Sequence, residues 1–194
     1  MGQGAYILGC EGPRLNAAEA AFFRQAQPWG FILFARNVET PDQLRALTSD
    51  LRAAVGRQAP VLIDQEGGRV QRMTPPHWRQ WLPPIDQVSR AGPNAARSMW
   101  LRYRIIAHEL AEVGIDANCA PSGDIANPDT HPFLMNRCYG QSREVVEPVA
   151  LAVADALQAG GCYAIAKHMP GHGRAVMDSH LTVPRVSAPR SELI

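Results

Sequence analysis

The sequence predicts an α/β fold in which a parallel sheet is covered by helices. Short apolar runs alternate with amphipathic runs along the whole chain, which is the pattern of repeated βαβ units. The apolar runs lack alternating polar residues, so their strands should be buried on both faces. Hydrophobic residues make up 46% and charged residues 19% of the 194 residues, so one folded domain can bury a substantial core.

Five strands are expected, each a short run rich in apolar residues. They are Ala5–Gly9, Gly30–Phe34, Val61–Asp64, Ile115–Cys119 and Cys162–Ala166. The five βα units together take up about 165 residues, whereas a closed (β/α)8 barrel has about 250. The chain is therefore interpreted either as a complete open sheet of five strands or as the first part of a barrel.

Local signals mark the first two helices. The first should begin after Asn16, because Asn16 and Glu19 have the spacing of a capping box, and should run to about Gln27. The second should have Thr40 as its N-cap and end at Gly56. Its apolar residues recur at helical spacing, at Leu44, Leu47, Leu51 and Val55.

Two further helices follow from the same periodicity. The third carries its apolar face on Met99, Tyr103, Ile106, Leu110 and Val113. Gly114 should end it. The fourth uses Val149, Val153 and Leu157 and should stop at Gly160. We expect it to start at Pro148, because a proline inside a helix removes a hydrogen bond.

Composition limits the kind of partner. The chain has 19 basic and 18 acidic side chains and a net charge of +1, which gives no strongly basic footprint for nucleic acid and no polybasic membrane anchor. No stretch reaches the ~18 apolar residues of a membrane span. The N-terminus lacks the pattern of a signal peptide, and the four widely spaced cysteines should be reduced thiols. We therefore expect a cytoplasmic protein with a small-molecule partner.

In both architectures the functional site forms where the strands end. Asp64 ends the third strand and precedes Gly67 and Gly68, which allow a tight turn. A carboxylate at that rim can accept hydrogen bonds from two neighbouring hydroxyl groups, which suits a sugar. The alternative is a turn in which Asp64 forms an ion pair with Arg69 or Arg72.

The loop after the fifth strand concentrates polar side chains. Lys167 is the single lysine among 19 cationic residues, so a compact ammonium group is expected to be needed there. A salt-bridged lysine at a strand end is the alternative. His168 and His172 have the spacing of a helical zinc site, but Pro170 and Gly171 between them prevent that helix, so no metal site is predicted.

Asp178 and His180, further along this loop, are candidates for proton transfer. Their spacing places both side chains on the same side of an extended backbone. An Asp that accepts a hydrogen bond from one imidazole nitrogen leaves the other nitrogen free to exchange a proton with substrate. The alternative is an ordinary surface turn. Arg137, after the fourth strand, either holds a polar substituent or only pins its own loop.

Four motifs, in chain order, resemble those of family 3 glycoside hydrolases, specifically the bacterial β-N-acetylglucosaminidase (β-hexosaminidase) branch. The motifs are Asp64–Arg72, Asn136–Arg137, Lys167–Gly173 and Asp178–His180. The resemblance implies a (β/α)8 TIM barrel, of which residues 1–194 supply about the first five βα units as a partial catalytic domain. It also implies an enzyme without a cofactor that removes terminal β-linked N-acetylglucosamine from muropeptides during peptidoglycan recycling.

The resemblance gives a role to each motif. The residues that would bind the sugar are Asp64, Arg72, Arg137, Lys167 and His168. Asp178 and His180 would form the acid/base dyad of a retaining, double-displacement hydrolysis. No metal ligand is implied.

The nucleophile implied by the resemblance is an Asp downstream of these motifs, and the chain ends at Ile194 before reaching it. We therefore expect this chain alone to be inactive, and to associate with a missing C-terminal segment or with itself. Alternatives are a relative that acts on another β-glycoside or by phosphorolysis, a metal-dependent hydrolase, and a non-catalytic sugar-binding fragment.

Overall fold

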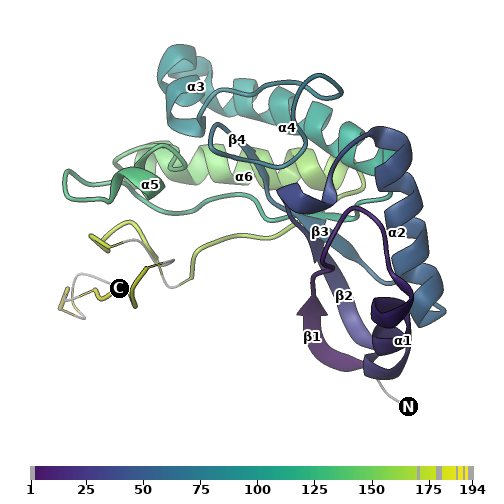
Figure 1. Cartoon of the computed structure of the whole chain (residues 1–194). Coiled ribbons are helices and arrows are strands. Elements are labelled where there is room, and N and C mark those ends of the chain that lie inside the picture. The colour runs from purple at the N-terminus through teal and green to yellow at the C-terminus, as the bar shows by residue number, and fades with distance from the viewer. Residues whose placement is uncertain (1–2, 170, 178–180, 187, 190, 192–194) are drawn as a thin grey trace.

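A five-stranded parallel sheet forms the centre of the computed structural model, which describes residues 3–169, 171–177, 181–186, 188–189 and 191. The strand order is β1-β2-β3-β6-β7 (Figure 1). The strands are β1 Gly4–Leu8, β2 Pro28–Leu33, β3 Val61–Ile63, β6 Ala117–Asn118 and β7 Tyr163–Ala164. Every predicted strand overlaps one of these, and every pairing in this sheet is parallel, so the predicted α/β class is confirmed.

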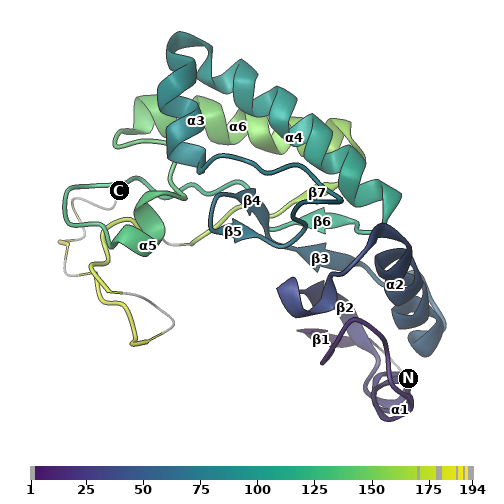
Figure 2. The same ribbon diagram turned by 45° about the horizontal axis from the view of Figure 1, so that its top comes forward.

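Helices cover one face of this sheet. They are α1 Ala17–Ala26, α2 Pro41–Val55, α4 Ala95–Glu112 and α6 Arg143–Ala159. Helix α3 Pro84–Ala91 packs against α4, and the short α5 Pro132–Met135 lies beside the strand ends. Figure 2 shows α4 and α6 side by side over the β6–β7 part of the sheet, and α1 and α2 beside β1 and β2. The core lies between, where Phe31 and Ile63 from the strands pack with Leu51, Ile106 and Val153 from the helices.

The other face of the sheet is open toward the β7 edge. In the register, Leu62 pairs with Ala117 and Ala117 with Tyr163, so all three side chains point to the same face. Tyr163 is 69% exposed on this face, whereas Cys162, which points toward the helices, is 4% exposed. A parallel sheet with helices on one face corresponds to the wall of a (β/α)8 barrel.

Both predicted N-caps are present. The Asn16 side chain accepts a hydrogen bond from the backbone N–H of Glu19 at 2.9 Å, and the Glu19 carboxylate accepts one from the backbone N–H of Asn16 at 3.4 Å. Thr40 accepts from the backbone N–H of Gln43 at 3.2 Å, and Gly56, with a φ of +69°, ends α2. These contacts satisfy backbone groups at the helix ends, which confirms the predicted α1 and α2.

The predicted start of the fourth helix is wrong. Helix α6 begins at Arg143 and contains Pro148 in its second turn. Pro148 has no N–H to donate to the preceding turn. The extra turn is nevertheless stabilised by packing, because Val146 is buried in the core together with Val149. Burial of a valine side chain contributes about 1.5 kcal/mol or more, which offsets much of one missing hydrogen bond.

A small antiparallel hairpin follows β3 and was not expected. It consists of β4 Gln65–Gly67 and β5 Val70–Gln71. Gly67 has a φ of +104°, and a Cβ atom there would lie 1.8 Å from Nη2 of the buried Arg102. The hairpin therefore requires glycine at this position, both for its backbone conformation and for the close approach of α4.

The described helices are all too short or too polar to cross a lipid bilayer. The cysteines Cys10, Cys119, Cys138 and Cys162 are all free thiols, as the sequence predicts.

We expect Gly67→Ala to lower the free energy of unfolding by about 2–4 kcal/mol, because it adds a steric clash to an unfavourable φ. Gly56→Ala is the matched control: Gly56 also has a positive φ, but a Cβ there meets nothing within 4 Å. The control should cost only about 1 kcal/mol. Urea unfolding of the three proteins measures the difference, and equal losses would contradict a role for the contact with Arg102.

Candidate active site at the strand ends

Parallel pairing brings distant polar residues to one edge of the sheet. Asp64 directly follows β3, and Cys119 directly follows β6. Lys167 lies three residues beyond β7 and is held there because its backbone pairs with Ser122 and its carbonyl accepts from the N–H of Gly123 at 2.6 Å. The carboxyl ends of parallel strands meet at the same edge, which is where α/β proteins form their sites.

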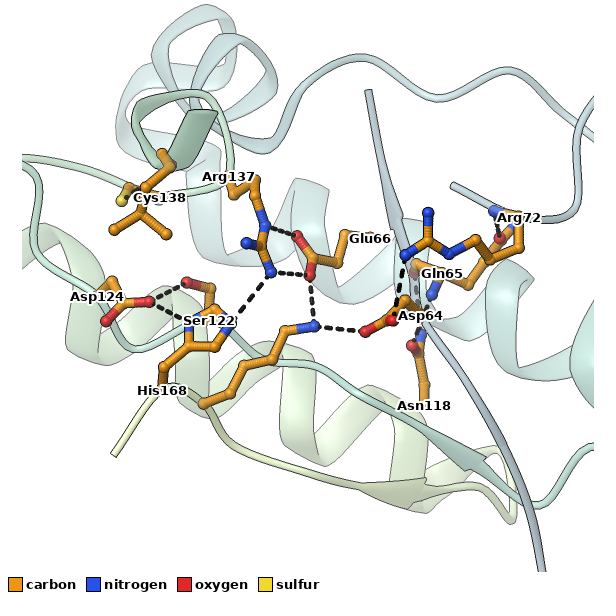
Figure 3. A network of polar contacts seen from close by, with 12 residues as sticks. Asp64, Gln65, Glu66, Arg72, Asn118, Ser122, Asp124, Arg137, Cys138 and His168 are labelled. Carbon is orange, nitrogen blue, oxygen red and sulfur yellow. Dashed lines mark hydrogen bonds and ion pairs between the residues drawn. The ribbon is translucent and has the colours of Figure 1, made fainter. Parts of the chain in front are cut away.

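A continuous series of ion pairs crosses this edge (Figure 3). Asp64 pairs with Arg72 at 3.3 Å and with Lys167 at 2.8 Å. The Lys167 ammonium also contacts Glu66 Oε1 at 2.5 Å. Glu66 in turn holds Arg137 through two bonds, at 3.0 Å to Nε and 2.8 Å to Nη2. Every cation in this series therefore has a carboxylate neighbour, as buried charges require.

The backbone beneath these side chains is fixed by a reciprocal amide contact. The N–H of Gln65 donates to Asn118 Oδ1, and Asn118 Nδ2 donates to the Gln65 carbonyl, each at 3.0 Å. Since alternate residues of an extended strand point the same way, Asp64 and Glu66 both project toward Lys167 while Gln65 points away. The two carboxylates therefore form one acidic clamp around one ammonium group.

The hairpin is held in place from the helix side. The buried Arg102 of α4 donates to the backbone carbonyl of Glu66, and its Nη1 donates to Gln87 Oε1 at 2.7 Å. The Arg102 guanidinium also lies over the Trp81 ring, 5.4 Å from its centroid. Burial lowers the pKa of this guanidinium below its ordinary value. Arg102 thus anchors the main chain of Glu66, which leaves the Glu66 carboxylate to bind Lys167 and Arg137.

Charge pairing outweighs burial for the central ion pair. Burial by itself would raise the pKa of Asp64, but the nearby Lys167 and Arg72 hold it below its ordinary value. Burial likewise would lower the pKa of Lys167, but Glu66 and Asp64 raise it above its ordinary value. Both groups are therefore charged at neutral pH.

A second polar cluster joins this series at Arg137. His168 Nε2 lies 3.1 Å from Arg137 Nη2, and His168 Nδ1 lies 2.5 Å from Asp124 Oδ2. The other carboxylate oxygen of Asp124 accepts the backbone N–H of His172 at 2.6 Å. Burial would raise the pKa of Asp124, but these hydrogen bonds from His168 and His172 lower it.

The five residues predicted to bind a sugar line one cavity of about 360 Å³. They are Asp64, Arg72, Arg137, Lys167 and His168. Its apolar lining consists of Val70, Cys119, Phe133 and Ile165. Burial, followed by the charge of Asp64, raises the pKa of the Cys119 thiol to about 11, so this cysteine is a neutral, apolar part of the wall. A larger surface groove of about 720 Å³, beside α2 and the end of α4, contains none of the predicted site residues.

These contacts bear on two alternatives left open by the sequence without choosing between them. Asp64 forms its ion pair with Arg72, and Arg69 instead lies over the Phe133 ring, 4.4 Å from its centroid. Lys167 is salt-bridged at its strand end, and it lines the cavity as well. Its ion pairs thus agree with both interpretations of this residue.

The predicted dyad residues Asp178 and His180 lie outside the described residues. The segment that leads toward them is anchored up to Ala175, which is 1% exposed. The Gly173 carbonyl accepts hydrogen bonds from Asn127 at 2.7 Å and from Thr130 at 2.5 Å. The loop after β6 therefore holds the start of the loop that carries the predicted dyad.

Sequence reasoning missed Glu66 and Asp124 as members of the site. Glu66 stands two residues after Asp64, so alternation along an extended strand offered a signal for it. Asp124 had no comparable signal, because its contact with His168 joins residues 44 positions apart.

Comparison with known proteins gives the family. Residues 5–194 match the family described as "Glycosyl hydrolase family 3 N terminal domain". The chain belongs to glycosyl hydrolase family 3. A "Beta-hexosaminidase" of Methylococcus capsulatus is 36% identical over 188 residues, which cover 94% of this chain and 54% of that protein. A "Beta-hexosaminidase" of Methylobacillus flagellatus is 36% identical over 194 residues, which cover 95% of this chain and 53% of that protein.

Solved structures with 29% sequence identity share the fold. Native NagZ from Neisseria gonorrhoeae superimposes with a TM-score of 0.88 at 29% identity, over 98% of this chain and 56% of that chain. A family 3 beta-N-acetylglucosaminidase from Paenibacillus has a TM-score of 0.88 at 29% identity, and the match covers 97% of this chain and 36% of that chain. This family 3 chain thus spans about half the length of the curated relatives it matches.

The series of ion pairs predicts an acid-sensitive fold. An Asp whose pKa is lower in the folded state contributes stability above its unfolded pKa of about 3.9 and loses it as pH falls through the folded value. Asp64 and Asp124 both have this sign. The free energy of unfolding should therefore fall as pH drops below about 5.

In the variant Asp64→Asn the free energy of unfolding should fall less between neutral and acidic pH, because position 64 then has no carboxylate to protonate. Urea midpoints measured across this range test the expectation. A pH dependence identical to that of the unchanged protein would contradict it.

Proposed function

We propose that this chain holds a terminal, non-reducing β-linked N-acetylglucosamine residue and delivers the proton for its hydrolysis. The observation that carries the proposal is the single cavity that unites Asp64, Lys167, Arg137 and His168, all of which the family resemblance nominates for sugar binding. Relatives named beta-hexosaminidase support it. Further support comes from NagZ of Neisseria gonorrhoeae "in complex with N-trifluoroacetyl-D-glucosamine", a structure that matches this chain with a TM-score of 0.89 at 29% identity.

The cavity has the chemistry that a sugar ring requires. Sugar hydroxyl groups both donate and accept hydrogen bonds, and here carboxylate acceptors stand beside ammonium and guanidinium donors. Lys167 has three N–H donors, and its two carboxylate contacts leave one for a ligand. Phe133 and Ile165 supply an apolar wall for the C–H surfaces of the ring. Charged partners held in place before binding reduce the entropic cost of ordering them.

The reaction proposed is a retaining double displacement. The His180 imidazolium, stabilised by Asp178, donates its proton to the glycosidic oxygen as the C1–O bond breaks. A carboxylate from outside this sequence forms the new bond to C1. A water molecule then attacks C1 and gives its proton back to His180, which releases the sugar and restores the carboxylate.

The exposed β7 edge of the sheet supports a partner segment that would cover it. Tyr163 and Ile165, exposed by 69% and 36%, lie at the β7 edge on the face that helices leave uncovered. We assign this edge to a C-terminal segment that supplies further parallel strands and the attacking carboxylate; self-association is the alternative. In this proposal the substrate is a muropeptide ending in N-acetylglucosamine, and the setting is peptidoglycan recycling in the cytoplasm.

Binding of the sugar tests the cavity directly. Titration of the chain with N-acetylglucosamine, followed by calorimetry or NMR, should show a single site. Asp64→Asn should weaken it by about tenfold or more, because one charge-assisted acceptor is lost and Lys167 is left with less compensation. Asp50→Asn, on an exposed position of α2, is the control and should leave affinity unchanged. Equal affinity in both variants would contradict the proposed site.

Turnover separates binding from catalysis. The 194-residue chain should bind N-acetylglucosamine yet release p-nitrophenol from its aryl β-glycoside only at the background rate, because in this proposal the attacking carboxylate comes from another segment. Rates comparable with those of complete family members would contradict this. Measurements with added phosphate test phosphorolysis, and any activity abolished by a strong chelator would indicate a metal-dependent hydrolase instead.

A further inference from the structure

A second Asp–His pair, formed by residues other than the predicted dyad, adjoins the cavity. It consists of Asp124, whose side chain is 0% exposed, and His168, whose side chain is 30% exposed. His168 contacts Asp124 through Nδ1 at 2.5 Å and Arg137 through Nε2 at 3.1 Å. The imidazole therefore bridges a buried carboxylate and the guanidinium that faces the proposed sugar.

The neighbours of His168 specify where its proton must be. A guanidinium carries only donors, so the nitrogen that faces Arg137 Nη2 must accept. The other nitrogen, Nδ1, then carries the proton and donates it to Asp124 Oδ2. The lowered pKa of Asp124 agrees with this, since a deprotonated carboxylate is the acceptor that the arrangement needs.

Asp124 is itself held in one orientation. Its Oδ1 accepts the backbone N–H of His172 at 2.6 Å, and its Oδ2 accepts the Ser122 hydroxyl at 3.3 Å in addition to His168. Three donors on two oxygens leave the carboxylate no freedom to turn. The carboxylate can therefore determine the tautomer of the ring that it contacts.

Arg137 depends on that tautomer. Its Nη2 has two hydrogens, one directed to Glu66 Oε1 at 2.8 Å and one to His168 Nε2 at 3.1 Å, and its Nε donates to Glu66 Oε2. A proton on His168 Nε2 would point at the second of these hydrogens. The guanidinium would then have to turn away from Glu66 and from its place in the cavity wall.

From this geometry we infer that Asp124 is a positioning residue for sugar binding: it keeps the proton of His168 on Nδ1 and thereby holds Arg137 on Glu66. Its effect on affinity rests on the proposed function, whereas its effect on the tautomer does not. Asp124 touches no ligand in this scheme and acts only through His168.

The tautomer is measurable in the unchanged protein. Long-range proton–nitrogen correlation spectra of the chain labelled with ¹⁵N-histidine distinguish protonated from bare ring nitrogens. The His168 signals are identified by their loss in His168→Gln. We expect a protonated Nδ1 and a bare Nε2 at neutral pH. A protonated Nε2, in either the neutral or the charged ring, would overturn the inference without any need for an Asp124 variant to fold.

The variant Asp124→Asn tests whether Asp124 determines the tautomer of His168. Its amide oxygen must face the His172 N–H, so its NH₂ group faces His168 Nδ1 and donates to it. The proton should move to Nε2, and N-acetylglucosamine should bind about tenfold more weakly or worse. Ser122→Ala removes another donor to the same oxygen but leaves the tautomer alone, so it should change affinity by about threefold or less.

The two proposals fail in different ways. An unchanged His168 tautomer in Asp124→Asn, or equal losses of affinity in both variants, would overturn the positioning role. A shifted tautomer in a protein that never binds N-acetylglucosamine would instead support the link between Asp124 and His168 and overturn the proposed sugar site.

Discussion

The contact on which the site depends is the ammonium of Lys167 between Asp64 and Glu66. It joins residues 103 positions apart, so it exists only because β3 and β7 end at the same edge of the sheet. Removing one partner of a buried ion pair leaves an uncompensated charge, which costs more than the pair itself contributes. The three charged groups are therefore interdependent. An arginine at position 167 would require a different arrangement of the two carboxylates, because a planar guanidinium cannot place a single nitrogen between them as the lysine ammonium does.

Two supports keep that contact in register. On the helix side, Arg102 holds the Glu66 main chain through a space that only a glycine at position 67 leaves open. On the loop side, the loop after β6 is in backbone contact with the segment that follows β7. A Cβ on Gly173 would lie 1.9 Å from the carbonyl oxygen of Ile125. Contacts on both sides thus hold the residues around the cavity, and fixed placement of polar groups lets them favour one ligand orientation.

The sheet itself is asymmetric in a way that matters for function. Its helix-covered face carries the core, whereas its uncovered face carries Asp64 and Cys119 at the strand ends and the exposed Tyr163 below them. Among the described residues β7 is an edge strand, and exposed apolar side chains at a sheet edge form a surface that proteins ordinarily cover. The binding groups and the exposed side chain at the β7 edge therefore lie on the same face of the sheet.

Much of this protein follows from its sequence alone. The caps at Asn16 and Thr40, the glycine that ends α2 and the apolar periods of α2 and α4 act within a few residues, so local patterns predicted those helices. Asp64 and Lys167 were predicted because they follow strands, whereas the full set of sugar-binding candidates came from the family resemblance. The tertiary structure decided the rest. Helix α3 has no side-chain cap, and α6 runs through Pro148 because Val146 finds a place in the core. Glu66 forms ion pairs with Lys167 and Arg137, and Asp124 contacts His168. These contacts join segments that only folding brings together. Local patterns determine which backbone hydrogen bonds form, whereas the partners of a buried charge depend on which chain segments share its surroundings.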